Sequence, residues 1–279
     1  MKVVVGKYSG FCFGVKRAID VAKETLATAF HPVYLVGEIV HNKVVVKDLE
    51  ASGLKRADDL ASIPSGSIII LKAHGSPPET YEKAKELGLE IIDATCPMVT
   101  DIHREAKRLE DQGYQVIVFG DKNHEEVIGI CGYVKDPIII APHEDIEPIR
   151  FRSRVAVVCQ STQKIDEISE FLRRLTQKVE EMLFVNTTCQ TTRQRQREIK
   201  ELAKTCDKVV IVGSRNSANT KHLYEEAVAI NAQTVWIETA EDLDRTFFST
   251  DDSVAVMSGA STPHEIINQI EQTLNSFFN

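Results

Sequence analysis

The sequence predicts an α/β fold built from three small units with mainly parallel sheets. Short apolar runs of strand length alternate with helical patterns along the 279 residues. A lone cysteine directly before a helical pattern occurs three times at comparable intervals, as Cys12, Cys96 and Cys189. Each interval also contains two further strand ends that carry polar, glycine-containing loops. We therefore predict three α/β units arranged around a pseudo-threefold axis.

The three cysteines set the expected domain boundaries. The predicted units span residues 13–96, 97–189 and 190–279. The strand expected at residues 3–5 precedes Cys12 in the way that the last strand of each unit precedes its cysteine. Residues 1–12 are therefore expected to pack onto the third unit. Because ligand loops lie at the carboxyl ends of parallel strands, we expect these ends to face the centre.

The individual elements follow from apolar runs and helix-end signals. Strands are expected at residues 3–5, 33–36, 68–71, 89–92, 115–119, 155–159, 183–185, 208–212, 234–237 and 253–257. Helices are expected at residues 15–27, 79–87, 97–112, 165–181, 191–203, 222–230 and 264–274, and a helical or mixed stretch is expected at residues 44–52. Pro97 suits a first helical position, where the missing N–H is tolerated, and Gly113 suits the end of the same helix.

The bulk composition excludes several classes of protein. Hydrophobic residues make up 43% of the chain, charged residues 27%, and the net charge is -8. An acidic molecule disfavours nucleic acid, so an anionic ligand requires a local binding site. No apolar stretch approaches the roughly 18 residues that span a bilayer, and the start of the chain lacks a secretory signal pattern. We expect a cytoplasmic protein with neither a nucleic-acid nor a membrane partner.

The cysteine pattern points to a metal centre gathered by the fold. The six cysteines include no C-x-x-C pair, which disfavours a disulfide framework and a compact zinc finger. A cysteine at a helix start faces unpaired N–H groups, which favour its thiolate. Three such thiolates would hold three irons of a [4Fe–4S] cluster and leave the fourth iron open as a Lewis acid. A three-cysteine zinc site with a bound water, or a coincidence of buried core cysteines, are the alternatives.

The other six strand ends supply polar groups that suit a phosphate or diphosphate. They carry His41, His74, His124 with Glu126, Ser161 with Thr162, Ser217 with Asn219, and Ser261. Imidazoles, hydroxyls, an amide and loop N–H groups are the groups that bind such anions. An acid beside an anionic ligand has a raised pKa, so Glu126 is a candidate proton donor. The alternative for Glu126 is an exposed acid in a charged loop that also contains Asp121 and Glu125.

Ordered motifs along the chain resemble those of one known family. They are GFCFGVKRAI, VHNKVVV, AHGSP, DATCPMVT, NHEEV-x-G, QST, TTCQTTRQRQ, GSRNSANT and SGAST. Together they resemble the 4-hydroxy-3-methylbut-2-enyl diphosphate reductase family, which performs the last step of the methylerythritol phosphate route to isoprenoids. The resemblance extends over essentially the whole chain.

The resemblance implies a trefoil of three α/β domains around a [4Fe–4S] cluster held by Cys12, Cys96 and Cys189. It implies a substrate-binding set of His41, His74, His124, Ser161, Thr162, Ser217, Asn219 and Ser261, with Glu126 as proton donor. The implied reaction is reductive dehydroxylation to isopentenyl and dimethylallyl diphosphates plus water, with electrons from a ferredoxin or flavodoxin. The chain departs from the family at Ala218, where serine is frequent, and at Ser161, where threonine is frequent.

Three other functions remain open from the sequence. A non-redox hydro-lyase would use the open iron only as a Lewis acid and would need no reductant. An iron–sulfur sensor or electron carrier normally closes its cluster with four closely spaced cysteines, which this chain lacks. A cluster-free phosphate-binding protein would be colourless and free of iron.

Overall fold

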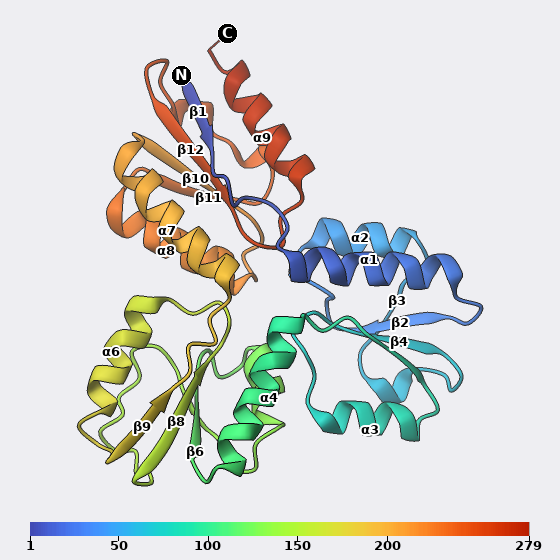
Figure 1. Ribbon diagram of the computed structural model, residues 1–279. Helices are drawn as coiled ribbons and strands as arrows, with labels where there is room; N and C mark the ends of the chain where they lie inside the picture. The colour runs from blue at the N-terminus through green and yellow to red at the C-terminus, as the bar shows by residue number, and fades with distance from the viewer. Residues whose placement is uncertain (279) are drawn as a thin grey trace. The chain divides into compact units, whose positions relative to one another are not determined.

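The computed structural model describes residues 1–278, which form three four-stranded parallel sheets flanked by helices (Figure 1). The chain divides into two compact units, each described by itself below. Unit 1 comprises residues 1–15, 41–45 and the segment from Gln190 onward, and unit 2 comprises Lys16–Val40 and Val46–Cys189. Sheet A belongs to unit 1, whereas sheets B and C belong to unit 2.

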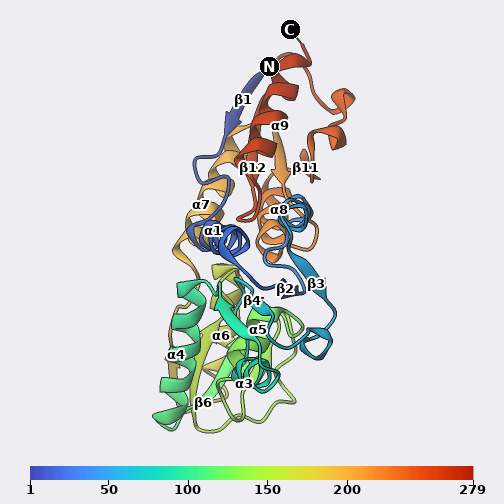
Figure 2. The same ribbon diagram turned by 90° about the vertical axis from the view of Figure 1, so that its right-hand side faces the viewer.

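The N-terminal strand forms one edge of sheet A. Its order is β1 (Lys2–Val5), β12 (Ser253–Ser258), β10 (Lys208–Val212) and β11 (Thr234–Ile237). β1 runs parallel to β12, with Lys2 opposite Ser253, so the first residues of the chain pair with one of the last strands. Helices α7 (Gln190–Thr205) and α8 (Ala218–Ile230) lie on one side of this sheet, and α9 (His264–Ser276) lies on the other (Figures 1 and 2).

Both faces of sheet A are buried, because alternate residues of its strands point to opposite sides. On one side Val210, Val212, Val254 and Val256 pack in the same cluster as the apolar residues of α9. On the other side Val209, Ile211, Ala255 and Met257 pack with apolar residues of α7 and α8. This double burial explains why these strands are continuous apolar runs rather than alternating patterns.

Sheet B is the first sheet of unit 2. Its order is β3 (Lys55–Ala57), β2 (Val33–Val36), β4 (Ile68–Leu71) and β5 (Glu90–Asp93). The helices around it are α1 (Phe13–Thr28), which precedes β2, α2 (Lys43–Ala51) and α3 (Pro78–Glu86). All four residues of β4 are buried, as expected for a central strand.

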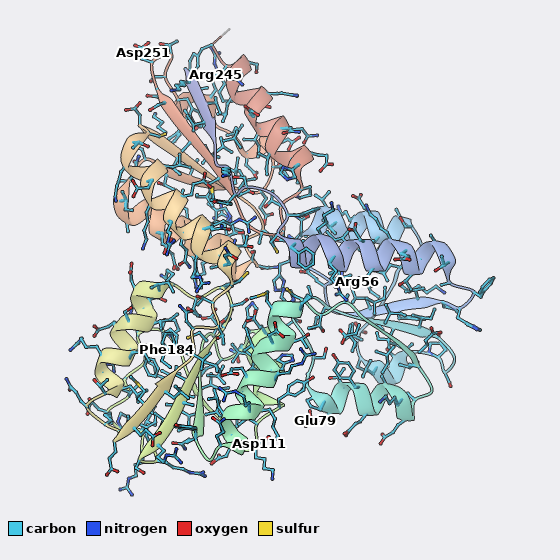
Figure 3. The ribbon with its side chains drawn as sticks, viewed as in Figure 1. Arg56, Glu79, Asp111, Phe184, Arg245 and Asp251 are labelled. Carbon is cyan, nitrogen blue, oxygen red and sulfur yellow. The ribbon has the colours of Figure 1, made fainter. Side chains whose placement is uncertain are left out.

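Sheet C has the same design. Its order is β7 (Ile138–Ile140), β6 (Gln115–Phe119), β8 (Arg154–Cys159) and β9 (Glu181–Phe184). Helices α4 (Pro97–Asp111) and α5 (Glu125–Cys131) share a core with one face, and α6 (Ile165–Leu175) shares a core with the other. Figure 3 labels Asp111 at the end of α4 that lies farthest from Cys96. Short 3₁₀ turns occupy Leu60–Ser62, Ala240–Asp242 and Arg245–Phe247.

The three sheets are topologically equivalent. Each sheet has two inner strands, β2 with β4, β6 with β8, or β10 with β12. The edge strand beside the first of these is β3, β7 or β11, and the edge strand beside the second is β5, β9 or β1. The predicted α/β class with parallel sheets is thereby confirmed. The threefold placement of the units around a central cluster stays a prediction.

Several element boundaries differ from the sequence expectations. The strands β3 and β7 and the helix α5 were not predicted, because each is very short or lies in a segment without clear periodicity. The helix expected to extend to residue 181 ends at Leu175, because the chain must turn back to form β9 from Glu181, and Val179 in this turn packs against the core of sheet C. Within residues 1–278, no helix combines the length and apolar content needed to cross a membrane.

Candidate functional site

Each of the three repeated cysteines directly precedes a helix. Cys12 precedes α1, Cys96 precedes α4 and Cys189 precedes α7. Cys96 is the N-cap of α4 and Pro97 is its first residue, as predicted from the sequence. The N–H of Val15 donates to the Sγ of Cys12 at 3.4 Å, so this sulfur accepts a hydrogen bond from the start of its helix.

The backbone holds these cysteines in the same way in all three sheets. The N–H of each donates to a carbonyl oxygen two residues past the end of an inner strand. The bonds join Cys12 to Ala260 after β12 at 3.1 Å, Cys96 to Ala73 after β4 at 3.0 Å, and Cys189 to Ser161 after β8 at 2.9 Å. Each cysteine is therefore fixed to one of the loops that carry the candidate substrate-binding residues.

The candidate polar residues also occupy equivalent places. His41, His124 and Ser217 each lie five residues past the ends of β2 at Val36, β6 at Phe119 and β10 at Val212. His74, Thr162 and Ser261 each lie three residues past the ends of β4 at Leu71, β8 at Cys159 and β12 at Ser258. His74 is thus equivalent to two hydroxyl residues and not to the other two histidines.

In unit 1, His41 and Ser261 lie together. The Ser261 hydroxyl donates to the His41 carbonyl oxygen at 3.1 Å, and the Asn42 side-chain amide donates to the Ser261 carbonyl oxygen at 2.8 Å. Asn42 also accepts from the N–H groups at the start of α2, and Ser217 accepts from the N–H of Thr220 at the start of α8 at 3.3 Å. These residues therefore lie at helix N-termini, which attract anions.

Asn219 has an unused donor in the first turn of α8. The residue is 5% exposed, and its Nδ2 has no hydrogen-bond partner among residues 1–278. A buried donor without a partner costs about 1–3 kcal/mol, which an acceptor ligand would recover. Gly213, with φ +144, and Gly259 let the ends of β10 and β12 approach this turn, because a Cβ at these positions would lie 2.8 and 2.0 Å from Thr220 Oγ1.

In unit 2, Glu126 is a buried acid held by Ser161. Glu126 is 2% exposed, and its Oε1 and Oε2 accept from the N–H and hydroxyl of Ser161 at 2.5 and 2.8 Å. Burial raises the pKa of Glu126, and the two hydrogen bonds from Ser161 offset part of this effect. The cause is burial, whereas the sequence argument invoked a neighbouring anion. The raised pKa suits a group that delivers a proton.

The rest of this cluster lies around the start of α5. His124 is the N-cap, and its Nδ1 accepts the N–H of Glu126 at 3.1 Å. The rings of His74 and His124 meet edge to face, with centroids 5.7 Å apart. The hydroxyl of Thr162 accepts from the buried Gln160 side chain at 3.1 Å. Unit 2 therefore brings together His74, His124, Glu126 and Ser161.

Glu125 is a site residue that the sequence reasoning missed. Its side chain is partly buried, with one carboxylate oxygen on the Lys72 ammonium and the other 3.2 Å from His74 Nδ1. Burial alone would raise the pKa of Glu125, but the hydrogen bonds from His74 and Lys72 lower it to about 2. Lys72 and His74 both follow β4 in the sequence, and this spacing was the available signal for a shared partner.

The remaining cysteines differ from the repeated three. Cys159 and Cys206 are buried in the cores beside sheets C and A, and Cys131 packs against the core shared by α4 and α5. Burial raises the pKa of the Cys159 and Cys131 thiols, the latter to about 11. Cys12, Cys96 and Cys189 are only partly buried, and none of them is in a disulfide.

The fold and these residues define an α/β protein in which loops of parallel sheets carry polar side chains, a buried acid and three cysteines that directly precede helices. A sequence profile of the family described as LytB protein matches residues 3–275. The chain belongs to this family. The resemblance seen in the motifs is thereby confirmed.

Curated relatives match over nearly their whole length. A protein of Aquifex aeolicus (strain VF5) is 37% identical, with 98% of this chain and 95% of the relative covered. A protein of Geobacter sulfurreducens (strain ATCC 51573 / DSM 12127 / PCA) is 38% identical, with 100% and 99% covered. Both relatives are named 4-hydroxy-3-methylbut-2-enyl diphosphate reductase.

Two solved structures share the fold. One, described as (E)-4-hydroxy-3-methyl-but-2-enyl diphosphate reductase, the terminal enzyme of the non-mevalonate pathway, is 37% identical with a TM-score of 0.74 and 99% of each chain covered. The other, E-1-hydroxy-2-methyl-but-2-enyl-4-diphosphate reductase from Plasmodium falciparum, is 31% identical with a TM-score of 0.93, and the match covers 100% of this chain and 88% of that one.

Proposed function

We propose that this protein is an oxidoreductase that converts 4-hydroxy-3-methylbut-2-enyl diphosphate into isopentenyl and dimethylallyl diphosphates with release of water. The observation that carries the proposal is a feature repeated in all three sheets: a cysteine directly before a helix donates its N–H to a strand-end loop. The names of the full-length relatives supply the substrate and the reaction.

The three cysteines fit a [4Fe–4S] cluster. They lie directly before helices and outside any disulfide, and they are partly exposed, unlike the buried Cys159 and Cys206. A set of three sulfurs suits a cluster with one iron that has no protein ligand, whereas structural zinc sites normally have four protein ligands. Cys12, Cys96 and Cys189 would hold this cluster. When bound, it supplies electrons to the substrate.

The diphosphate is assigned to the polar loop residues. His41, Ser217, Asn219 and Ser261 of unit 1 and His74 and His124 of unit 2 would bind it, and Thr162 lies in the equivalent loop of sheet C. Charge-assisted hydrogen bonds from imidazoles are stronger than those between neutral groups. Ala218 removes one hydroxyl from the set, which costs about 0.5–1.5 kcal/mol of binding and is tolerable among so many donors.

Glu126 is assigned the proton transfer. Loss of the hydroxyl as water and formation of a C–H bond consume two electrons and two protons. Burial favours the protonated form of Glu126, and Ser161 donates hydrogen bonds to both of its carboxyl oxygens. The acid therefore carries a proton to deliver and is fixed in orientation. The electrons are assigned to a ferredoxin or flavodoxin, as the resemblance to the family implies.

The shared strand order of the three sheets supports a division into three domains. We place their limits at residues 13–96, 97–189 and 190–279, with the N-terminal strand on the third. In this arrangement each domain contributes one cysteine to the cluster from the start of a helix.

Iron content and turnover test the proposal together. Anaerobically purified protein should contain iron and should form both products only when a low-potential reductant is present. Cys12→Ser, Cys96→Ser and Cys189→Ser should each lose most of the iron, whereas the buried Cys159→Ser control should keep it. Conversion of the substrate without reductant would instead identify a hydro-lyase. A colourless, iron-free protein that binds diphosphate would identify a phosphate-binding protein.

A further inference from the structure

Lys72, Glu125 and His74 form a continuous chain of contacts inside unit 2. The ammonium of Lys72 contacts Glu125 Oε1, and Glu125 Oε2 lies 3.2 Å from His74 Nδ1. The three side chains are 19%, 33% and 17% exposed, so the contacts are shielded from much of the solvent. Lys72 and His74 follow β4 of sheet B, whereas Glu125 begins α5 beside sheet C.

The residue that follows β2, Gly37, lies next to the ion pair. Gly37 has φ +81, and a Cβ there would lie 3.4 Å from Lys72 Nζ and 3.5 Å from Glu125 Oε1. Three loops from two sheets therefore surround the pair. A surface ion pair contributes little, but one that is held on several sides and screened from water interacts more strongly.

A carboxylate among diphosphate-binding residues needs an explanation. Glu125 is ionised at neutral pH, since its pKa is lowered to about 2. By itself this charge would repel a diphosphate, because like charges at short range disfavour binding. The other oxygen of Glu125 contacts the ammonium of Lys72. The Lys72–Glu125 pair therefore has a net charge close to zero, and His74 lies next to it.

We propose that Lys72 and Glu125 are positioning residues for His74, which they orient for binding the diphosphate. Glu125 Oε2 faces His74 Nδ1 at 3.2 Å, so the other ring nitrogen, Nε2, is the one presented to the ligand. Lys72 cancels the charge of Glu125 so that the carboxylate does not repel the substrate. This inference rests on the proposed function and extends it.

The two adjacent acids then have separate tasks. Glu126 accepts hydrogen bonds from Ser161 and delivers a proton in the reaction. Glu125 contacts His74 and affects the affinity for the diphosphate. Substitutions at the two positions should therefore change different kinetic parameters. A merely structural role for Glu125 would not separate affinity from turnover in this way.

The test compares Glu125→Gln, Lys72→Met and the double variant in the holoenzyme. Binding of inorganic pyrophosphate is measured by calorimetry, and KM and kcat are measured with an artificial reductant. Glu125→Gln should weaken pyrophosphate binding and raise KM about tenfold, the value of one charge-assisted hydrogen bond, with little change in kcat. Lys72→Met should weaken binding more than this, because it leaves an uncompensated carboxylate. The double variant should return to the affinity of Glu125→Gln.

Lys107 and Glu110, an ion pair of the same residue types 2.9 Å apart on α4, provide the control. Lys107→Met and Glu110→Gln should leave both affinities unchanged. Glu125→Asp, which keeps the charge, should bind pyrophosphate better than Glu125→Gln and guards against a variant that fails to fold. The inference is overturned if Lys72→Met binds as well as or better than the double variant, or if Glu125→Gln changes kcat alone. A wild-type protein that binds pyrophosphate but shows no reductant-dependent turnover would refute the proposed function and leave this inference standing.

Discussion

Replacement of Glu126 by glutamine should abolish most of the turnover while sparing substrate affinity. Glutamine has the same shape, and its amide can keep both contacts with Ser161 by accepting the N–H and donating to the hydroxyl. It cannot deliver a proton. A positioned general acid contributes about 10²–10⁴-fold, so kcat should fall by about this factor, whereas KM should change by less than about threefold.

The stability of the same variant separates chemistry from folding. The pKa of Glu126 is raised in the folded protein, so the folded state holds the proton more tightly than the unfolded chain. The resulting stabilisation is fully present below the unfolded carboxyl pKa of about 4.3 and is lost as the pH rises through the folded value. Glutamine carries no charge at any pH. At neutral pH, Glu126→Gln should therefore unfold at the same or a higher denaturant concentration than the wild type.

The assay is anaerobic turnover with an artificial low-potential reductant, across a pH series, with iron content and denaturant unfolding measured on the same preparations. Wild-type kcat should fall as the pH rises through the pKa of Glu126, and this limb should be missing from the residual activity of Glu126→Gln. An unchanged kcat in Glu126→Gln would refute the proton-donor assignment. A loss of iron in this variant would show that the effect on activity is indirect.

Two further outcomes follow from buried polar groups. Asn219→Ala should raise KM about tenfold, because it removes one donor to the diphosphate. It should not lower the free energy of unfolding, because Asn219 Nδ2 has no partner among the described residues. Steady-state kinetics measure the first effect and urea unfolding measures the second. His103 is 3% exposed and stacks on Tyr133 with centroids 4.4 Å apart, and burial lowers its pKa to about 4. Since the unfolded chain takes up this proton first, stability should fall by on the order of 3 kcal/mol as the pH drops from about 6.5 to about 4, and His103→Phe should lack this part of the pH dependence in urea titrations.

The strong strands and the three cysteine helices could be predicted from the sequence because their signals are local. Residues 115–119, 208–212 and 234–237 are apolar runs that coincide with β6, β10 and β11. Pro97, directly after Cys96, predicts a helix start by residue type alone. Such features depend on neighbouring residues and need no knowledge of the tertiary fold.

The features that escaped prediction depend on distant parts of the chain. Helix α5 has few residues and contains Gly129, which looks like a helix breaker in the sequence. In the structure Gly129 lies against α4 and the His74 loop, since a Cβ there would be in ordinary contact with His103 Nε2 at 3.4 Å and with the Gly75 carbonyl carbon at 3.6 Å, and these neighbours support the short helix. The pairing of Lys72 with Glu125 likewise requires sheets B and C to meet, and no local pattern contains that information.

The backbone bonds that tie Cys12, Cys96 and Cys189 to Ala260, Ala73 and Ser161 have a thermodynamic consequence. A ligand that orders these loops also restrains the cysteines, and anything that restrains the cysteines orders the loops. Coupling between two sites is reciprocal, so substrate and metal centre should each increase the other's retention by the same factor. Bound diphosphate should then slow the loss of iron to a chelator. Because the link passes through main-chain atoms, side-chain substitutions in the loops leave this mutual protection in place.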